Sequence, residues 1–358
     1  MIESFIFTKN LIVKYFFTSL ISLLLISCGG ESTEQNNTDA ENAVVVDSIP
    51  EIDSLQYYSE QIAAHPKNAD WHYKRAVYTL SNGNLMSSKA DLEVAILLDS
   101  TNLDVRLMYG NLQLSLTHID TSKYHYDYIL RKDSANTGAL LGMSKLYALL
   151  NNSAMADAYI SSALKVDPYL AEAYFMRGII YRTDYYDTGR EESRERALSS
   201  FQTTVEQDPD FYAAYVEMGV MYDEAGSDLS LEYYNSALDI FPESQEAWYN
   251  IGMFHQNRGN VEAALVAYRT LNTIDSLWAE PYYNQGNVHL LLNKDYDSAV
   301  FFFSKAVELN PNHFKAYNNM GLAYEDKNDL TNARRYYSKA VDIDPNFQLA
   351  KDNLNRIQ

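Results

Sequence analysis

A repeat of 34 residues runs through most of this 358-residue chain, and it severely limits the folds that the chain can adopt. The repeat is in register when its windows start at Ala69, Leu103, Thr137, Ala171, Tyr212, Gln245, Ala279 and Phe314. The eighth position is small in every window: Ala76, Gly110, Ser144, Gly178, Gly219, Gly252, Gly286 and Gly321. The register needs seven extra residues in the fourth window, one fewer in the fifth and one more in the seventh.

Two further positions repeat with the same regularity. The twentieth is small: Ser88, Ser122, Ala156, Ala197, Ser230, Ala264, Ala299 and Ala333. The twenty-fourth is large: Leu92, Tyr126, Ile160, Phe201, Tyr234, Tyr268, Phe303 and Tyr337. Small residues let two helices approach closely while the large residue fills the space beside them, so each window predicts an antiparallel helix pair. Because one pair cannot bury its own apolar faces, the pairs should stack into an all-α solenoid without a sheet.

The best-formed windows carry a family resemblance. Trp248-Tyr249-Asn250-Ile251-Gly252 and Tyr317-Asn318-Asn319-Met320-Gly321, the second followed by Ala333, Tyr337, Ala340 and Pro345, resemble the tetratricopeptide repeat. The resemblance covers residues 69–347 as about eight repeats. It implies a right-handed superhelix whose first helices line a concave groove that binds peptides or partner proteins.

Short helices are expected to cap both ends of the repeats. Residues 51–68 predict an N-terminal capping helix, with Ile52, Leu55, Tyr58 and Ile62 on one face. Residues 348–358 predict a C-terminal capping helix with Leu349, Leu354 and Ile357 pointing inward. Solenoids need such caps for solubility.

Residues 1–27 have the composition of a signal peptide. Lys9 and Lys14 precede an apolar run from Tyr15 to Ile26, which is short for a membrane span. Leu25-Ile26-Ser27-Cys28 resembles the bacterial lipobox, and Cys28 is the single cysteine of the chain. The resemblance implies that Cys28 is lipidated and becomes the mature N-terminus. Gly29 follows the cysteine, where an Asp would indicate retention at the inner membrane. We therefore expect attachment to the bacterial outer membrane.

Residues 28–50 predict a lipidated, acidic, flexible tether. Its Val44-Val45-Val46 run is either a docking strand or an apolar patch within a linker.

The net charge of −20 excludes some classes of partner. Nucleic acid is not expected, because its binding needs a basic stripe and none is visible. The acidic surplus favours partner proteins or peptides with basic segments, although acidic residues that only solvate the outer faces would give the same composition.

The predicted binding residues lie at the fifth and sixth positions of windows six to eight: Tyr249, Tyr283 and Asn318, and Asn250, Asn284 and Asn319. A carboxamide can both donate to and accept from a peptide unit, whatever the peptide's side chains are. Asparagine at the sixth position also belongs to the family's general pattern, so ligand contact and family packing are both open.

The seven extra residues fall within 183–196, which should lengthen the turn inside the fourth helix pair. The segment is either a second contact site or a self-paired extension of the two helices.

No catalytic arrangement is recognisable. The seven histidines show no metal-ligand spacing, and His255 and His289 share the eleventh position, where packing is expected. We therefore expect no enzyme activity, metal or cofactor. The sequence predicts a membrane-anchored scaffold or adaptor for other proteins of the bacterial cell envelope. The alternative is a glycan-binding protein or enzyme that uses a tyrosine-rich groove.

Overall fold

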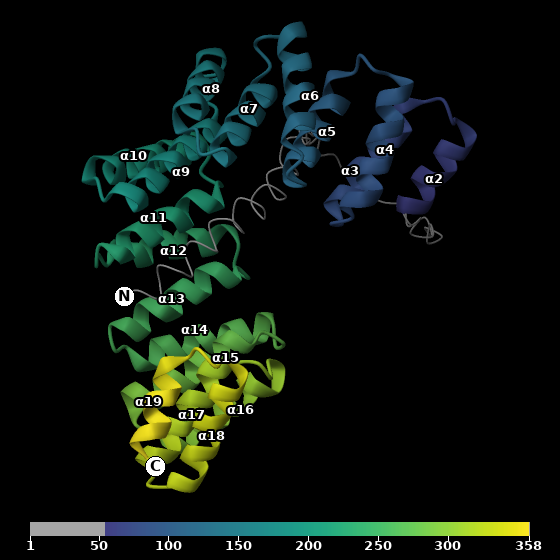
Figure 1. Ribbon diagram of the computed structural model, residues 1–358. Coiled ribbons are helices and arrows are strands. Elements are labelled where there is room, and N and C mark those ends of the chain that lie inside the picture. The colour runs from purple at the N-terminus through teal and green to yellow at the C-terminus, as the bar shows by residue number, and fades with distance from the viewer. Residues whose placement is uncertain (1–53, 358) are drawn as a thin grey trace, which may run out of the picture. The chain divides into compact units, whose positions relative to one another are not determined.

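The computed structural model describes residues 54–357, which contain helices and no strand (Figure 1). They form two compact units that divide between Ser200 and Phe201. Unit 1 contains α2 (Ser54–Ala64), α3 (Ala69–Ser81), α4 (Leu85–Leu98), α5 (Leu103–Ser115), α6 (Ile119–Lys132), α7 (Thr137–Leu149), α8 (Ser153–Val166), α9 (Ala171–Thr188) and the start of α10 (Glu191–Gln207).

Unit 2 continues from α10 with nine α-helices and one π-helix. They are α11 (Tyr212–Glu224), α12 (Leu229–Ile240), α13 (Gln245–Asn257), α14 (Val261–Ile274), α15 (Ala279–Asn287), η1 (Val288–Asn293), α16 (Tyr296–Leu309), α17 (Phe314–Asp326), α18 (Leu330–Ile343) and α19 (Gln348–Arg356). Every window holds one helix pair, and within each unit successive pairs pack on one another. The predicted all-α stack of helix pairs is confirmed.

The small eighth residue lies against the large twenty-fourth residue of the same window. A methyl group on Gly252 would come within 2.5 Å of Tyr268 Cε1, and one on Gly321 within 2.6 Å of Tyr337 Cδ1. Both distances are too short for carbon atoms, so these rings require glycine beside them.

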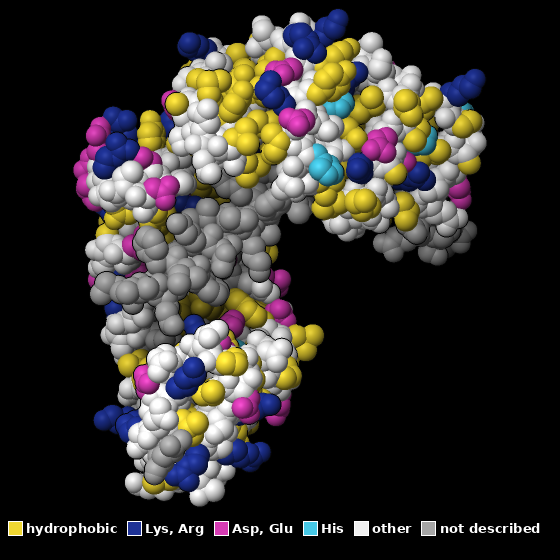
Figure 2. All heavy atoms as spheres, in the orientation of Figure 1, with side chains coloured by type: hydrophobic (Ala, Val, Ile, Leu, Met, Phe, Trp, Pro, Cys, Tyr) yellow, Lys and Arg dark blue, Asp and Glu magenta, His cyan; other side chains and the backbone are white. Residues whose placement is uncertain are grey.

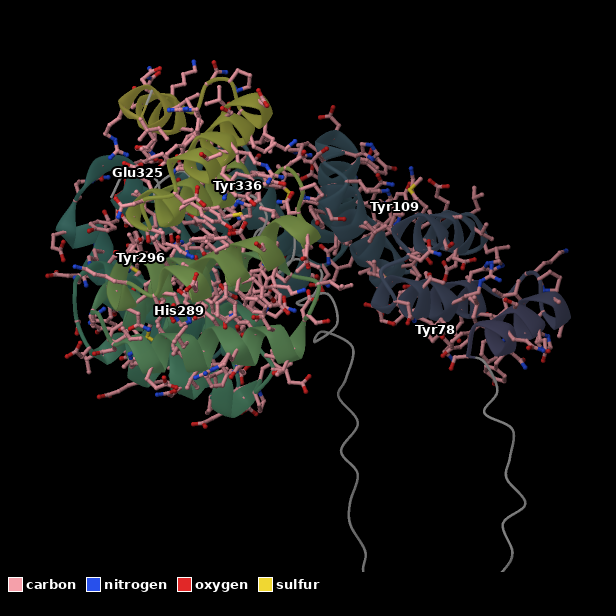
Figure 3. The ribbon with its side chains drawn as sticks, turned by 90° about the horizontal axis from the view of Figure 1, so that it is seen from below. Tyr78, Tyr109, His289, Tyr296, Glu325 and Tyr336 are labelled. Atoms are coloured by element: carbon pink, nitrogen blue, oxygen red, sulfur yellow. The ribbon has the colours of Figure 1, made fainter. Side chains whose placement is uncertain are left out.

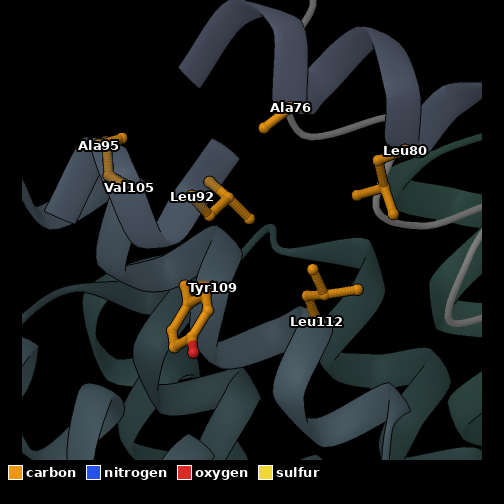
Figure 4. Packing of buried hydrophobic residues seen from close by; sticks show 7 residues of the cluster. All are labelled: Ala76, Leu80, Leu92, Ala95, Val105, Tyr109 and Leu112. Carbon is orange, nitrogen blue, oxygen red and sulfur yellow. The ribbon is translucent and has the colours of Figure 1, made fainter. Parts of the chain in front are cut away.

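The two positions also vary together along the chain. Where the eighth residue carries a side chain, the twenty-fourth is aliphatic. Ala76 occurs with Leu92, both labelled in Figure 4. Ser144 occurs with Ile160. In all six windows with glycine at the eighth position, the twenty-fourth is Tyr or Phe. The sum of the two volumes is thus held nearly constant, as close packing demands.

The first helices are also fixed at their N-terminal ends. Asn68, Asn102, Asn136 and Ser244 accept hydrogen bonds from backbone N–H groups of the helices that follow them. One turn into the helix, the fourth residue of three windows donates to the carbonyl that closes the preceding window. These bonds join Arg106 to Ser100, Tyr174 to Pro168 and Trp248 to Pro242.

The extra residue of the seventh window is absorbed by η1. The helix that begins as α15 continues through Val288–Asn293 as a π-helix, which fits one additional residue into the same length of axis. Lys294 then ends it in the left-handed conformation at φ 55°.

Both predicted caps are helical. In α2, the Tyr57 ring lies 6.0 Å from the Trp71 ring of α3. In α19, Ala350 is fully buried, whereas Leu349 is 53% exposed. The inward orientation predicted for Leu349 is therefore wrong, because the helix turns the small residue beside it toward α18. Leu354 and Ile357 are half-buried.

The predicted leader (1–27), the tether (28–50) and Cys28 lie outside the described residues. Within residues 54–357, no helix combines the length and apolar character needed to cross a membrane.

Candidate protein-binding surface

We define the first-helix face as the fifth, sixth and ninth positions of α13, of α15 and of α17, all in unit 2. Its members are Tyr249, Asn250, Met253, Tyr283, Asn284, Asn287, Asn318, Asn319 and Leu322. The face results from helix geometry. The side of each first helix that carries the glycine at the eighth position packs on the second helix of the pair, and the fifth, sixth and ninth positions lie on the neighbouring side. Most members are half-buried, while Asn284, Asn287 and Asn318 are buried.

Hydrogen bonds between side chains connect the asparagines of successive windows. Asn319 donates from Nδ2 to Asn287 Oδ1 at 2.8 Å, which joins α17 to α15. Asn318 donates to Asn319 Oδ1 at 3.1 Å and accepts from Asn353 of α19 at 3.0 Å. The face is therefore held in place by amide groups, which suits a preorganised binding surface.

The six predicted binding residues are not equally accessible. Asn318 is 2% exposed and Asn284 is 5% exposed. Asn284 donates from Nδ2 to Met253 Sδ at 4.0 Å, and burial raises the pKa of the neighbouring Tyr249. Tyr249, Tyr283, Asn250 and Asn319 are half-buried. That these six residues bind a peptide stays a prediction.

Asn250 differs from the other asparagines. Within residues 54–357, its carboxamide makes no hydrogen bond, although it lies between the half-buried Tyr249 and the buried Ile251. A half-buried amide with free donors and acceptors can pair with the backbone of a bound peptide.

Carboxylates accompany the first-helix face at the second position of α13 and α15, whereas α17 has Lys315 there. Glu246 accepts a hydrogen bond from Tyr212 at 3.5 Å, and Glu280 lies 3.3 Å from His313 Nε2. Burial raises the pKa of Tyr212, and the charge of Glu246 raises it further. In the chain, no Lys or Arg occurs between Arg196 and Arg258, while eleven Asp and Glu do. This end of unit 2 is therefore strongly anionic.

Pairs of stacked rings join the two helices of several windows and were not predicted from the sequence. They combine the eleventh and twenty-third positions: Tyr147 with Tyr159, Tyr222 with Tyr233, and Tyr324 with Tyr336. Figure 3 labels Tyr336, the α18 member of the last pair. Recurrence of aromatic residues at these two positions was the available signal. Each ring covers one face of its partner, which leaves less aromatic surface for stacking on a sugar.

The histidines at the eleventh position pack as predicted. His289 stacks on Phe302 at 5.2 Å, and the His255 ring lies 5.3 Å from that of Phe254. Burial lowers the pKa of both imidazoles. In the described part of the chain, no group of three His, Cys, Asp or Glu side chains is placed to hold a metal ion.

The insertion in the fourth window lengthens the helices rather than the turn. The paired helices α9 and α10 have 18 and 17 residues, and only Gly189 and Arg190 connect them. The predicted long turn is therefore wrong, because acidic and basic residues at helical spacing extend both helices. Arg194 pairs with Glu191, and Arg196 pairs with Glu192. This pairing matches the self-paired alternative.

Family models for the tetratricopeptide repeat match residues 245–276, 279–313 and 314–347. These are windows six to eight, which also carry the first-helix face. The chain therefore contains tetratricopeptide repeats.

Known proteins are similar in sequence to part of this chain. BBSome complex member BBS4 of Bos taurus is 27% identical over 195 residues, which are 54% of this chain and 36% of that protein. The probable UDP-N-acetylglucosamine–peptide N-acetylglucosaminyltransferase SPINDLY of Hordeum vulgare is 27% identical over 170 residues, 45% of this chain and 17% of that protein. The chain spans less than half the length of these relatives.

Among solved structures, the APC/C hetero-tetramer Cut9–Hcn1 is similar in fold. It aligns with a TM-score of 0.53 and 18% identity over 85% of this chain and 58% of that chain. This likeness supports a solenoid of helix pairs.

Proposed function

We propose that the protein is a lipid-anchored scaffold of a bacterial cell envelope that holds partner proteins on its first-helix face. The observation that carries the proposal is the face itself: half-buried Tyr249, Asn250 and Tyr283 stand on helices fixed by glycine-ring packing and by amide hydrogen bonds. Rigid aromatic and amide groups bind a partner with little loss of conformational entropy.

The location rests on the sequence before the repeats. The resemblance of Leu25-Ile26-Ser27-Cys28 to a lipobox supports acylation of Cys28 and attachment to the outer membrane. A diacylated and amide-acylated cysteine would hold the chain firmly, because each buried methylene contributes about 0.8 kcal/mol.

The charge supports the choice of partner. Glu246 and Glu280 flank the first-helix face, so a segment rich in Lys or Arg is the partner that it favours. Association should weaken with salt, since exposed charges are screened over about 10 Å at 0.1 M ionic strength. The proposed role is non-catalytic.

A matched pair of substitutions tests the face. Asn250→Arg adds bulk and positive charge to the first-helix face, and Asn235→Arg makes the same change at an exposed position of α12. Proteins cross-linked to the chain in intact cells are recovered and quantified by mass spectrometry. We expect Asn250→Arg to lower recovery of at least one partner about tenfold or more, as a loss of ~1.4 kcal/mol implies, while Asn235→Arg retains it.

The same cells test the location independently. The N-terminal peptide of the native protein should begin at Cys28 and carry acyl chains by mass. Equal partner recovery from both arginine variants would refute the binding face, whereas an unmodified leader would refute the anchor alone.

A further inference from the structure

The last two residues of each second helix differ in character between the two units. In unit 1, α4, α6 and α8 end in Leu97-Leu98, Arg131-Lys132 and Lys165-Val166, six residues that we call the basic rim. At the same two window positions, unit 2 carries Glu206-Gln207, Asp239-Ile240, Thr273-Ile274, Glu308-Leu309 and Asp342-Ile343. These positions are thus apolar and cationic in unit 1, whereas in unit 2 they hold apolar residues, four carboxylates and no cation.

The basic rim is accessible. Leu97 is 84% exposed and Val166 is 46% exposed, and Arg131, Lys132 and Lys165 are exposed as well. In unit 1 of Figure 2, Lys and Arg side chains follow the edge at which α6 ends in Figure 1. None of the three cations forms an ion pair with a described residue. Their charge is therefore available to a ligand.

Aspartates in the adjoining turns do not explain the difference between the units. Asp99, Asp133 and Asp167 follow the rim helices, and their carboxylates accept N–H bonds within their own turns. Unit 2 has the equivalent Asp208, Asp275 and Asp344. Behind the rim, Arg106 is 6% exposed, stacks on Tyr128 and pairs with no carboxylate of the described chain. It adds positive potential to this edge of unit 1.

The whole units differ in the same direction. Residues 54–200 contain 15 Lys and Arg against 17 Asp and Glu, a net charge of −2, whereas residues 201–357 contain 11 against 23, a net charge of −12. An anionic surface would therefore repel unit 2 much more strongly than unit 1.

We propose that the basic rim contacts the anionic lipid surface to which the chain is anchored. The inference rests on the proposed function, because the segment from Cys28 enters the fold at α2, in unit 1. Leu97, Leu98 and Val166 lie among the headgroups and upper acyl chains, while Arg131, Lys132 and Lys165 meet the lipid phosphates. This contact keeps unit 1 at the membrane, while the acidic unit 2 carries the first-helix face that binds partners.

Vesicle sedimentation tests the rim without the anchor. The chain from residue 28 carries Cys28→Ser, so it cannot be acylated, and it is mixed with phosphatidylglycerol–phosphatidylethanolamine vesicles or with phosphatidylcholine vesicles. We expect binding to the anionic vesicles, weakened about thirtyfold in Arg131→Gln/Lys165→Gln, since each cation near the surface contributes about 1 kcal/mol. Leu97→Ser should weaken binding by about tenfold through lost apolar burial.

The matched control is Lys294→Gln/Lys339→Gln, which removes two exposed cations of unit 2. It should bind like the parent chain, and helical circular dichroism confirms that each variant is folded. Sedimentation equal in both lipids, or a control as weak as the rim variant, would overturn the proposal. The proposal would also be overturned if the parent chain did not bind anionic vesicles and if Arg131→Gln/Lys165→Gln lost a cross-linked protein partner in cells. Acylation of Cys28 is measured on the native protein, so failure of the anchor is distinguishable from failure of the rim.

Discussion

At the scale of the residue, the contact between the eighth and twenty-fourth positions decides whether a helix pair closes. The chain uses two solutions: glycine with an aromatic ring, or a small side chain with an aliphatic one. Ser144 with Ile160 and Gly252 with Tyr268 represent them, and all four residues are buried. Either combination fills the space between the two helices of a pair. A small side chain opposite an aromatic ring would overfill that space, and glycine opposite an aliphatic residue would leave a cavity.

Gly252→Ser should therefore destabilise the protein, and Tyr268→Ile should partly restore it. The added side chain would meet the Tyr268 ring at 2.5 Å, and overpacking of this kind costs about 1–3 kcal/mol. The double variant recreates the pair of the third window. Urea unfolding of both single variants and the double variant measures the coupling. Additive losses would contradict the volume argument.

The stability of unit 1 should depend on pH through His125. Burial lowers the pKa of its imidazole to about 4 from 6.5, and the charge of Arg106 contributes. The unfolded imidazole gains its proton near pH 6.5 but the folded one near pH 4, so the free energy of unfolding should fall as pH decreases between those values. The slope for one proton is at most about 1.4 kcal/mol per pH unit.

Unfolding of the parent chain and of His125→Gln across that pH range checks this. The variant should lose part of the slope between pH 6.5 and 4. His255 and His289 of unit 2, whose pKa values are also lowered by burial, should give unit 2 a pH dependence of the same sign, which His125→Gln leaves unchanged. Identical slopes for the two proteins would show that His125 does not titrate as stated.

At the scale of the element, the position of an insertion determines whether it becomes helix or turn. Seven residues rich in alternating charges lengthen α9 and α10, and one residue in the seventh window becomes the π-helix η1. The η1 residues Leu291 and Leu292 are 60% and 39% exposed, so the extra residue adds no buried apolar contact.

Deleting Leu292 should consequently leave the fold intact. The seventh window would regain 34 residues, and η1 could continue as α-helix, so the urea midpoint should stay equal or rise. The eighth window already has 34 residues, so deleting Asp326 from it should lower the urea midpoint substantially. The residues of the turn that follows would then be out of register with α17 and α18. Equal effects of the two deletions, compared by urea unfolding, would mean that η1 is not an absorbed insertion.

The repeat pattern predicts helices and their inner faces well, but not contacts between windows. Residues such as Ala264 and Tyr268 recur at fixed positions, so their burial could be predicted. The burial of Asn318 could not, because it depends on Asn353 of α19, which lies outside the repeat. Likewise, Leu349 fits an amphipathic pattern, but the choice between it and Ala350 is made by the surface of α18.

At the scale of the whole molecule, the two units differ in net charge, and we propose that they have different roles. In our account, the N-terminal cysteine attaches the protein, the nearly neutral unit 1 meets the membrane, and the acidic unit 2 receives partners on the first-helix face. Each proposed role uses side chains that do not take part in packing the helix pairs. One repeat can therefore serve several roles.

Photo-cross-linking in cells tests this account most directly. A photoreactive amino acid replaces Asn250 on the first-helix face or, as the matched control, Asn235 on α12. The account predicts a discrete adduct with a protein that has a basic segment from position 250, and none of it from position 235. The same adduct from both positions, or adducts from position 235 alone, would contradict the claim that the first-helix face holds the partner.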